Sequence, residues 1–392
     1  MKIVFVHDHK FCRDEAGTYY SDGQFPYELW LRYLQYFDEI VVMGRVRSLR
    51  EEESWEILDR SSGPKVEFVE IPVPQHPGAR LFSSRKVKKR MEKIIRHADG
   101  VIVRNGELAI LAAGVAQRLQ KVWAVEVVSS AFDGFWHHGS LLGKLYAPWA
   151  EFAMRRMVWK APFALYVTQQ FLQKRYPCSG KTAACSDVQL DFSTLVDKQA
   201  RQQRELLGER VLRIGMIGSL VPAYKGLKTA FAALRRLKEK GFYFEFHILG
   251  GGDLKPWKVL AVKEGIDQET YFDGILPKNA VGAWLDQVDI YIQPSLTEGL
   301  PRALLEAMGR GCPAIASQVG GISELLEASC LHRPGDAEGL ARLLKQALLE
   351  PAWREVQGQR NLAVAAEHAE AKVEVIRGAF WQEFRRACEE RR

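Results

Sequence analysis

The sequence has few cysteines and no long apolar run, and both absences exclude whole classes of protein. Its six cysteines are scattered among 392 residues without C-x-x-C spacing, which indicates neither a zinc site nor a disulfide framework. No window approaches the ~18 apolar residues of a membrane-spanning helix. The first residues, Met1–Asp8, form an apolar run too short for a signal peptide and are expected to form a buried strand. We therefore expect a cytoplasmic protein with reduced thiols, whose membrane contact, if any, is peripheral.

Positive charge is in slight excess, and it is concentrated in one segment. The formal net charge is +7, from 55 lysines and arginines against 48 aspartates and glutamates. Residues 80–96 carry eight of the basic side chains around apolar positions that recur at helical spacing. A basic amphipathic helix of this kind can lie on anionic headgroups at the inner face of a membrane, although an ordinary solvated helix has the same pattern. Aromatic residues do not interleave with the basic ones as in nucleic-acid-binding motifs, so no nucleic-acid partner is expected.

Apolar runs of strand length alternate with helical patterns along the chain. The length exceeds the ~250–300 residues at which a single hydrophobic core stops growing, so two domains are expected. Repeated β-α alternation predicts the α/β class, with a doubly wound parallel sheet in each domain. The expected strands are Ile3–Val6, Ile40–Met43, Val66–Ile71, Val101–Val103, Val122–Val127 and Leu165–Val167 in the first half, and Leu212–Ile217, Phe244–Leu249, Tyr271–Phe272, Ile290–Ile292, Ala314–Ala316 and Cys330–His332 in the second.

The domain boundaries follow from a polar interruption between the two sets of strands. Residues 191–210 are rich in charged and amide side chains, and we expect a partly helical linker there. Residues 1–190 then form the first domain and residues 211–370 the second. The last helix, within residues 371–392, follows a segment that has no strand to pair with, and it is expected to pack back on the first domain.

The most informative segment runs from the strand Ile290–Ile292 through a loop into a helix. It contains two glutamates eight positions apart, Glu298 in the loop and Glu306 in the first helical turns. Ligands of parallel sheets bind at the carboxyl ends of the strands, close to helix N-termini whose N–H groups favour anionic oxygens. Carboxylates accept hydrogen bonds from hydroxyls, while amides and cations bind phosphates. The segment therefore fits a ligand with both kinds of group, such as a nucleotide sugar.

A second candidate segment opens the second domain. After the strand Leu212–Ile217, glycines allow close backbone approach, and Lys225 and Gly226 precede a helix expected to begin near Leu227. A lysine at a helix N-terminus beside the ligand edge of a sheet can hold a diphosphate, although most lysines are simply solvated. The run Gly250–Asp253 is also open to two interpretations, a phosphate loop or a tight turn.

In combination these segments resemble the retaining nucleotide-sugar glycosyltransferases usually numbered family four. The matching pieces are "KG" after the first strand of the second domain, "LGGGD", "FDG", "PSLTEGLPRALLEAMGRGCPAIAS", "GGISELL" and "HRPGD", which together cover most of residues 212–334. That family has the GT-B fold, in which two Rossmann-like domains face each other across a cleft. The resemblance therefore implies the GT-B fold and a glycosyltransferase activity.

The resemblance also implies roles for individual residues. In that family the first glutamate of the pair lies by the donor sugar and the reaction centre, the second holds the ribose hydroxyls, and the lysine neutralises the diphosphate. Carried over to this sequence, these residues are Glu298, Glu306 and Lys225. The other positions implied for the donor, through backbone amides beside the sugar and phosphate or by contact with the base, are Gly299, Leu300, Gly274 and Ile275.

The second domain departs from the family pattern at the diphosphate. The family usually has an arginine six residues before the lysine, and here that position is Ser219. Either Lys225 and helix N–H groups suffice, or another cation such as Arg302 contributes to binding the donor. The resemblance therefore leaves open which groups bind the diphosphate.

The first domain matches the family more loosely. Gly23 fits the glycine-rich loop that family members often have after the first strand, and the resemblance implies a role for it in binding the donor. They also often have a histidine near the acceptor after the fifth strand, but here His137 and His138 come late in the corresponding loop. A catalytic role for His138 and an ordinary surface histidine are both open, and Asp133 is an alternative residue for the acceptor side.

The chemistry implied is the transfer of a sugar from a nucleotide diphosphate sugar, UDP- or GDP-linked in the first instance, to a hydroxyl, with the anomeric configuration retained. The family favours attack on the same face of the sugar, and a covalent intermediate on Glu298 stays open. No D-x-D segment is present. The family's use of helix dipoles and cations implies that neither a metal nor another cofactor is needed.

A fainter resemblance concerns the pathway. The opening "HDHKF" and the pieces "YVT" and "RYP" are similar to bacterial transferases that build capsule, exopolysaccharide or O-antigen. The expected acceptor is then a saccharide or a lipid-linked saccharide. Two other functions stay open on the same fold: a sugar-nucleotide epimerase or hydrolase, and a catalytically silent subunit that binds nucleotide sugars.

Overall fold

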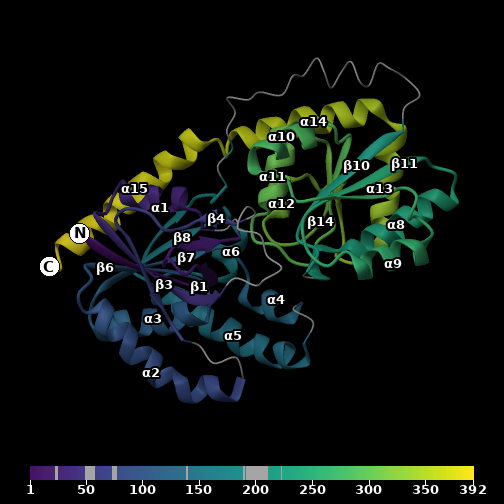
Figure 1. Ribbon diagram of the computed structural model, residues 1–392. Coiled ribbons are helices and arrows are strands. Elements are labelled where there is room, and N and C mark those ends of the chain that lie inside the picture. The colour runs from purple at the N-terminus through teal and green to yellow at the C-terminus, as the bar shows by residue number, and fades with distance from the viewer. Residues whose placement is uncertain are drawn as a thin grey trace.

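Two sheets, each flanked by helices, make up the chain (Figure 1). The computed structural model describes residues 1–22, 25–48, 58–72, 77–137, 140–188, 190, 211–221 and 223–392. The expected linker, 191–210, lies outside these residues. The first sheet is built from strands between Lys2 and Ala184, and the second from strands between Leu212 and His332.

The first sheet has nine strands within the described part of the chain. Strands β5, β3, β1, β6, β7, β8 and β9 lie side by side in that order and are parallel, while the short β2 and β4 add an antiparallel edge beside β1. The central β6 and β7 are buried along their whole length and mostly apolar, as expected for strands covered on both faces. The bounds are β1 Lys2–Arg13, β2 Tyr19–Ser21, β3 Glu39–Ser48, β4 Asp59–Arg60, β5 Val66–Glu70, β6 Gly100–Arg104, β7 Val122–Val127, β8 Phe163–Tyr166 and β9 Lys181–Ala184.

Helices cover both faces of the first sheet (Figure 1). On one face α2, α3 and α5 contribute buried side chains such as Met91, Ala112 and Met154 to the core. On the other face α1 and α15 bring in the buried Trp30 and Trp381. The bounds are α1 Tyr27–Leu34, α2 Pro77–Ile95, α3 Glu107–Arg118, α4 Ala131–Trp136, α5 Leu141–Trp159, α6 Phe171–Arg175 and α15 Glu370–Glu389.

The second sheet is parallel throughout, in the order β12-β11-β10-β13-β14-β15. The chain builds outward from β10 in one direction and from β13 in the other, so the strand order reverses between these neighbours. Ligands of doubly wound sheets bind beyond such a reversal. The strands are β10 Leu212–Ile217, β11 Phe244–Leu249, β12 Thr270–Gly274, β13 Ile290–Gln293, β14 Ala314–Ser317 and β15 Leu331–His332. The helices are η2 Ala223–Lys225, α8 Leu227–Glu239, α9 Lys255–Glu264, α10 Lys278–Asp286, α11 Arg302–Gly309, α12 Ile322–Leu325, η3 Ala328–Cys330, α13 Ala337–Leu349 and α14 Pro351–Ala366.

The last two helices connect the two halves of the molecule (Figure 1). Helix α14 packs on the second half, and the Glu370 N–H that opens α15 donates to the Leu190 carbonyl at 3.4 Å. Helix α15 then runs along the first sheet, where the ring of Trp381 lies 5.6 Å from that of Tyr33 and 5.7 Å from that of Phe384. Aromatic pairs at these separations contribute beyond their buried area. The C-terminal helix is therefore part of the core of the first half.

The α/β class and a doubly wound sheet in each half are confirmed, and each expected strand overlaps a strand of the structure. The sequence pattern does not predict β2, β4 or β9, because these edge strands are short and have few apolar residues. It also misses the length of β1, which continues past a register shift between Val6 and Lys10. Among the described residues, no helix combines the length and the apolar character that crossing a membrane requires.

Candidate active site

The candidate site lies where β10 and β13 end side by side in the second sheet. Gly226 has a φ of +79°, and a Cβ there would be 1.9 Å from the Pro294 carbonyl oxygen, so glycine is what allows the loops after the two strands to meet. The Leu296 N–H also donates to the Tyr224 carbonyl at 2.7 Å. Two loops that are distant in the sequence are therefore held against each other.

Lys225 and Glu298 form an ion pair at this contact. The Nζ atom of Lys225 lies 2.8 Å from the Oε1 atom of Glu298, and the two side chains are only 19% and 10% exposed. Burial by itself would lower the pKa of Lys225, but the Glu298 carboxylate outweighs this effect, and the net shift is upward. The lysine is therefore a charged, oriented cation at neutral pH.

A buried row of hydrogen bonds fixes the Glu298 carboxylate. Its Oε1 atom accepts from Gln293 Nε2 at 2.9 Å and from the Ser295 hydroxyl at 2.7 Å. The Gln293 side-chain oxygen accepts from the Tyr291 hydroxyl at 2.7 Å, and the Ser295 carbonyl accepts from the Ser317 hydroxyl. These four supporting residues are fully buried. Gln293 and Ser295 therefore hold Glu298 in one orientation, and hydrogen bonds to Tyr291 and Ser317 fix Gln293 and Ser295 in turn.

Helix α11 carries the second glutamate of the pair. Glu306 lies in its second turn and is partly buried, and Arg302, at the first position of the helix, is exposed. Burial raises the pKa of Glu306, while the charges of Arg302 and Lys278 reduce that shift. Arg302 therefore acts on the electrostatics of this site, at the helix N-terminus where a cation is expected from the sequence.

The positions expected beside the diphosphate and the base lie along the same edge of the sheet. Ser219 is exposed just after β10, and Gly274 ends β12 with a φ of +74°. The exposed Ile275 side chain lies so close to Gly251 that a Cβ there would be 2.6 Å from it. The loops after β10, β11 and β12 thus form one continuous rim next to the Lys225–Glu298 pair.

The first half of the chain contacts this site from the other side. A Cβ on Gly299 would lie 2.0 Å from the carbonyl oxygen of Val128, which follows β7. Next to it Leu300 is buried. Glu324 of α12 accepts hydrogen bonds from three successive backbone N–H groups of residues 169–171, at 2.6, 3.0 and 2.6 Å. The two halves therefore meet directly beside Glu298.

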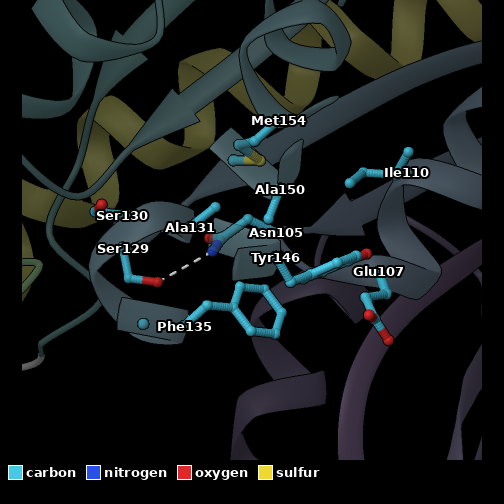
Figure 2. A pocket seen from close by; sticks show the side chains of 12 residues that line it. Asn105, Glu107, Ile110, Ser129, Ser130, Ala131, Phe135, Tyr146, Ala150 and Met154 are labelled. Carbon is cyan, nitrogen blue, oxygen red and sulfur yellow. Dashed lines mark hydrogen bonds between the residues drawn. The ribbon is translucent and has the colours of Figure 1, made fainter. Parts of the chain in front are cut away.

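A pocket of about 210 Å³ opens beyond the ends of β6 and β7 (Figure 2). On its polar side the Asn105 amide donates to the Ser129 hydroxyl at 3.0 Å. Phe135 and Tyr146 from α4 and α5 lie on its aromatic side, as Figure 2 shows. Ser129 is next in sequence to the residue that contacts Gly299, so the pocket borders the loop that carries Glu298.

Within the described part of the chain, no residue expected on the acceptor side lines this pocket. Asp133 lies on α4, where its carboxylate is 3.3 Å from Arg175, and Arg175 also binds Glu151 at 2.8 Å. Asp133 does not line the pocket, whereas its neighbours on α4, Gly134 and Phe135, do. His138 and Gly23 lie outside the described residues. The structure gives Asp133 an ion-pairing role, and a catalytic role for it or for His138 stays a prediction.

The sequence reasoning misses the residues that support the site. Gln293 ends the buried strand β13 and Ser295 lies two residues beyond it. Buried polar groups need hydrogen-bond partners, so polar residues at these positions are a usable signal. Asn105 and Ser129 also follow strands at the ligand edge, but single polar residues are common in such loops. The close approach at Gly299 has no signal in one sequence, because it depends on how the two halves face each other.

Comparison with known proteins supports the family resemblance. Residues 212–350 match the family described as Glycosyl transferases group 1. Over 370 residues the chain is 33% identical to Protein CapJ of Staphylococcus aureus, with 93% of this chain and 91% of that protein covered. It is 37% identical over 160 residues to the amylovoran biosynthesis glycosyltransferase AmsK of Erwinia amylovora, which covers 38% of this chain and 37% of that protein.

Solved structures with the same arrangement of two sheets are similar over the whole chain. Sucrose-phosphate synthase from Thermosynechococcus elongatus matches with a TM-score of 0.72 at 15% identity, over 99% of this chain and 100% of that one. Anabaena HepE in complex with UDP matches with a TM-score of 0.65 at 16% identity, over 100% of both chains. Such identities show the fold alone, whereas the match to CapJ shows the family. The chain belongs to the glycosyl transferases group 1 family and is a glycosyltransferase with the GT-B fold.

Proposed function

We propose that this glycosyltransferase moves a sugar from a nucleotide diphosphate sugar, UDP- or GDP-linked, to a hydroxyl of a saccharide or lipid-linked saccharide. The observation that carries the proposal is the Lys225–Glu298 pair, 2.8 Å apart, at the edge where the strand order reverses. A cation and a carboxylate fixed side by side suit the two groups that a sugar-diphosphate bond joins, since the cation binds phosphate and the carboxylate accepts from sugar hydroxyls.

Charge stabilisation at the leaving group is the main catalytic effect in this proposal. When the bond from the anomeric carbon to the diphosphate breaks, negative charge grows on the phosphate oxygen. A fixed ammonium stabilises that charge more in the transition state than in the ground state, which is what raises the rate. Lys225 would supply this charge, with the N-terminus of α11 and Arg302 as further electropositive groups. No bound metal is required by this assignment.

Retention of configuration follows in the proposal from attack on the face that the diphosphate leaves. The acceptor oxygen forms the new bond to the anomeric carbon as the bond to the diphosphate breaks, and the acceptor proton passes to the leaving phosphate oxygen. Glu298 would orient the donor sugar. Its Oε1 atom already accepts from Lys225, Gln293 and Ser295, and a carboxylate held in one position suits an orienting role.

We assign the acceptor to the pocket beside Ser129. The pocket combines the polar Asn105 and Glu107 with the rings of Phe135 and Tyr146, a mixture that suits the hydroxyls and the apolar faces of sugar rings. It borders the Glu298 loop, so an acceptor there would face the anomeric carbon of a donor bound to the second half.

The names of relatives support a place in the synthesis of a bacterial surface polysaccharide. AmsK is named for amylovoran biosynthesis, and a relative from Escherichia coli, 38% identical over 133 residues, is named as a putative colanic acid biosynthesis glycosyltransferase. Anabaena HepE, which has the same fold, was solved with UDP and with UDP-glucose. We therefore propose the transfer as a cytoplasmic step that extends such a polysaccharide.

A thermal-shift assay of the purified protein against UDP-, GDP-, ADP- and dTDP-sugars tests the donor. A ligand that binds only the folded state stabilises it by RT ln(1 + [L]/Kd), about 2.7 kcal/mol at a hundredfold excess over Kd. We expect one nucleotide to raise Tm. Glu306→Ala should remove most of that increase, because a hydrogen bond to a charged group contributes about 1.5–3 kcal/mol. Glu338→Ala, which removes an exposed carboxylate on α13, is the matched control.

The outcome separates the alternative functions. If no nucleotide raises Tm, the donor site beside the exposed Ser219 is degenerate. The result would then favour the catalytically silent subunit. If a nucleotide sugar binds but is converted without any acceptor, the protein is an epimerase or hydrolase. The proposal is supported if sugar is transferred to an added acceptor and if Glu306→Ala removes most of the nucleotide-induced rise in Tm.

Donor binding should weaken as the pH falls into the mildly acidic range. The loss should begin at a higher pH than it would if Glu306 were an exposed glutamate. Burial raises the pKa of Glu306, so as the pH falls this side chain takes up a proton earlier and loses the charge that strengthens its hydrogen bonds to hydroxyls. The Kd of the nucleotide, measured by calorimetry across this range, is expected to rise. In Glu306→Gln, which cannot titrate, the Kd should be higher throughout and much less dependent on pH. An identical pH profile in both proteins would contradict the assignment.

A further inference from the structure

Helix α5 leaves a large apolar face uncovered. The side chains of Leu141, Leu145 and Phe152 are 75%, 72% and 65% exposed. Their spacing of four and seven residues places them on one stripe along the helix. The stripe is widened by the exposed Leu142, Trp149 and Trp159. Contiguous apolar surface of this kind on a water-soluble fold marks an interaction site.

The rest of the same face is basic. All of α5 is described, and its exposed charged residues are Lys144, Arg155 and Arg156, with Lys160 at the C-cap. The one acidic residue of the helix, Glu151, is turned inward and binds Arg175 at 2.8 Å. Helical spacing places the basic side chains on both flanks of the stripe, where long side chains can extend past an apolar patch to reach polar groups.

Helix α4 extends this surface. The half-exposed Trp136 stacks on Phe132 with a ring separation of 5.2 Å, and Lys144 of α5 lies 5.7 Å from the centre of the Trp136 ring. The two helices therefore present one surface, which we call the α4–α5 face. Tryptophans with one polar edge are typical of the boundary between water and lipid.

The charge of helix α2 indicates what the α4–α5 face binds. Helix α2 packs on the same side of the first sheet as α5 (Figure 1). Its described outward residues are nearly all basic: Arg85, Lys86, Lys88, Lys89, Arg90 and Lys93. An anionic bilayer complements both features, because its headgroups bind the basic side chains and its acyl boundary takes up the apolar stripe.

We propose that the α4–α5 face docks on an anionic membrane, with Leu141, Leu145 and Phe152 inserted at the boundary between headgroups and acyl chains. The inner side of the same helix contributes Tyr146 and Met154 to the acceptor pocket. Docking therefore brings the pocket to the membrane surface. The inference rests on the proposed function, which it deepens: the acceptor is a lipid-linked saccharide whose lipid stays in the bilayer while its sugar enters the pocket.

Sedimentation of the full chain with vesicles tests the docking. On vesicles of equal parts phosphatidylglycerol and phosphatidylcholine we expect the wild-type protein to sediment, and on phosphatidylcholine alone to bind more weakly. The variant L141S/L145S/F152S should lower the partition coefficient on the anionic vesicles by at least about tenfold. The control V259S/V262S/V356S removes apolar side chains of similar exposure from the second half, 65%, 64% and 62%, and should bind like the wild type.

Each outcome bears on one claim. Unchanged vesicle binding in the α5 variant, or no binding by the wild type, overturns the docking. A wild-type dimer that the α5 variant dissociates, measured by light scattering without lipid, also overturns it, because the face then binds a second copy. The Tm and the nucleotide-induced rise in Tm are measured on both variants: their retention in the α5 variant shows that it is folded and that the donor site is intact. If nucleotides do not raise the Tm of the wild-type protein, the result would instead count against the proposed function.

Discussion

Lys225→Met is expected to lower kcat/KM for sugar transfer by about a hundred- to a thousandfold, the usual effect of removing one fixed donor from a developing negative charge. The side chain is held 2.8 Å from Glu298 and is largely buried, so no water or neighbouring group replaces its charge at low cost. The variant should also be less stable, by up to about 3 kcal/mol, because a mostly buried carboxylate loses its cation. Release of nucleotide from the donor, followed with acceptor present, measures the first effect, and thermal unfolding the second.

Two further variants separate catalysis from stability. Lys228→Met makes the same chemical change at an exposed lysine in the first turn of α8, and both quantities should stay close to those of the wild type. Lys225→Met/Glu298→Gln removes the unpaired carboxylate as well, so stability should recover while activity stays low. Undiminished transfer in Lys225→Met would contradict the role of this lysine at the leaving diphosphate.

The strand, loop and helix around the expected donor residues could be predicted because their signals are local in the sequence. A strand, an interrupted loop and a helical pattern place Glu298 and Glu306, and Gly226 marks the start of the next helix, which the structure begins at Leu227. Each signal needs only a few neighbouring residues. The edge to which these loops belong follows from the parallel β-α alternation, since all strand ends of one direction meet there.

The pairing inside the site could not be predicted, because it depends on strand order. Lys225 and Glu298 are 73 positions apart, and they meet only because β10 and β13 are neighbours. The support from Gln293 and Ser295 is different, because both residues lie within five positions of Glu298 in the sequence. At the acceptor side the problem is sharper, since Asp133 has an ion pair with Arg175 that a search for catalytic carboxylates does not anticipate.

The edge of the first sheet was missed for a related reason. Strands β4 and β9 are exposed or half-exposed along their length and contain little apolar surface. They exist because each pairs with a neighbour that is already in place. Hydrophobic periodicity reports burial, so strands that form by backbone pairing alone leave little trace in it.

Gly299→Ala is expected to reduce transfer by at least about tenfold, with a smaller effect on donor binding. The added Cβ would lie 2.0 Å from the Val128 carbonyl oxygen, and backbone cannot give way as a flexible side chain can. The loop of Glu298 or the end of β7 must therefore shift, at a cost of about 1–3 kcal/mol for overpacking. A shift of this kind separates the donor from the acceptor pocket, and small misplacements of reacting groups have large effects on rate. Activity assays and the nucleotide-induced rise in Tm measure the two consequences.

Gly309→Ala is the matched control, ten positions along in α11. A Cβ there would lie 3.7 Å from a methyl group of Leu190, which is ordinary contact, so the substitution should be neutral or slightly stabilising. If Gly299→Ala lost the nucleotide-induced rise in Tm together with transfer, the damage would lie in the donor site itself. Loss of transfer alone, with Glu306 and Lys225 still binding the nucleotide, would mean that catalysis depends on how closely the two halves approach at this one glycine.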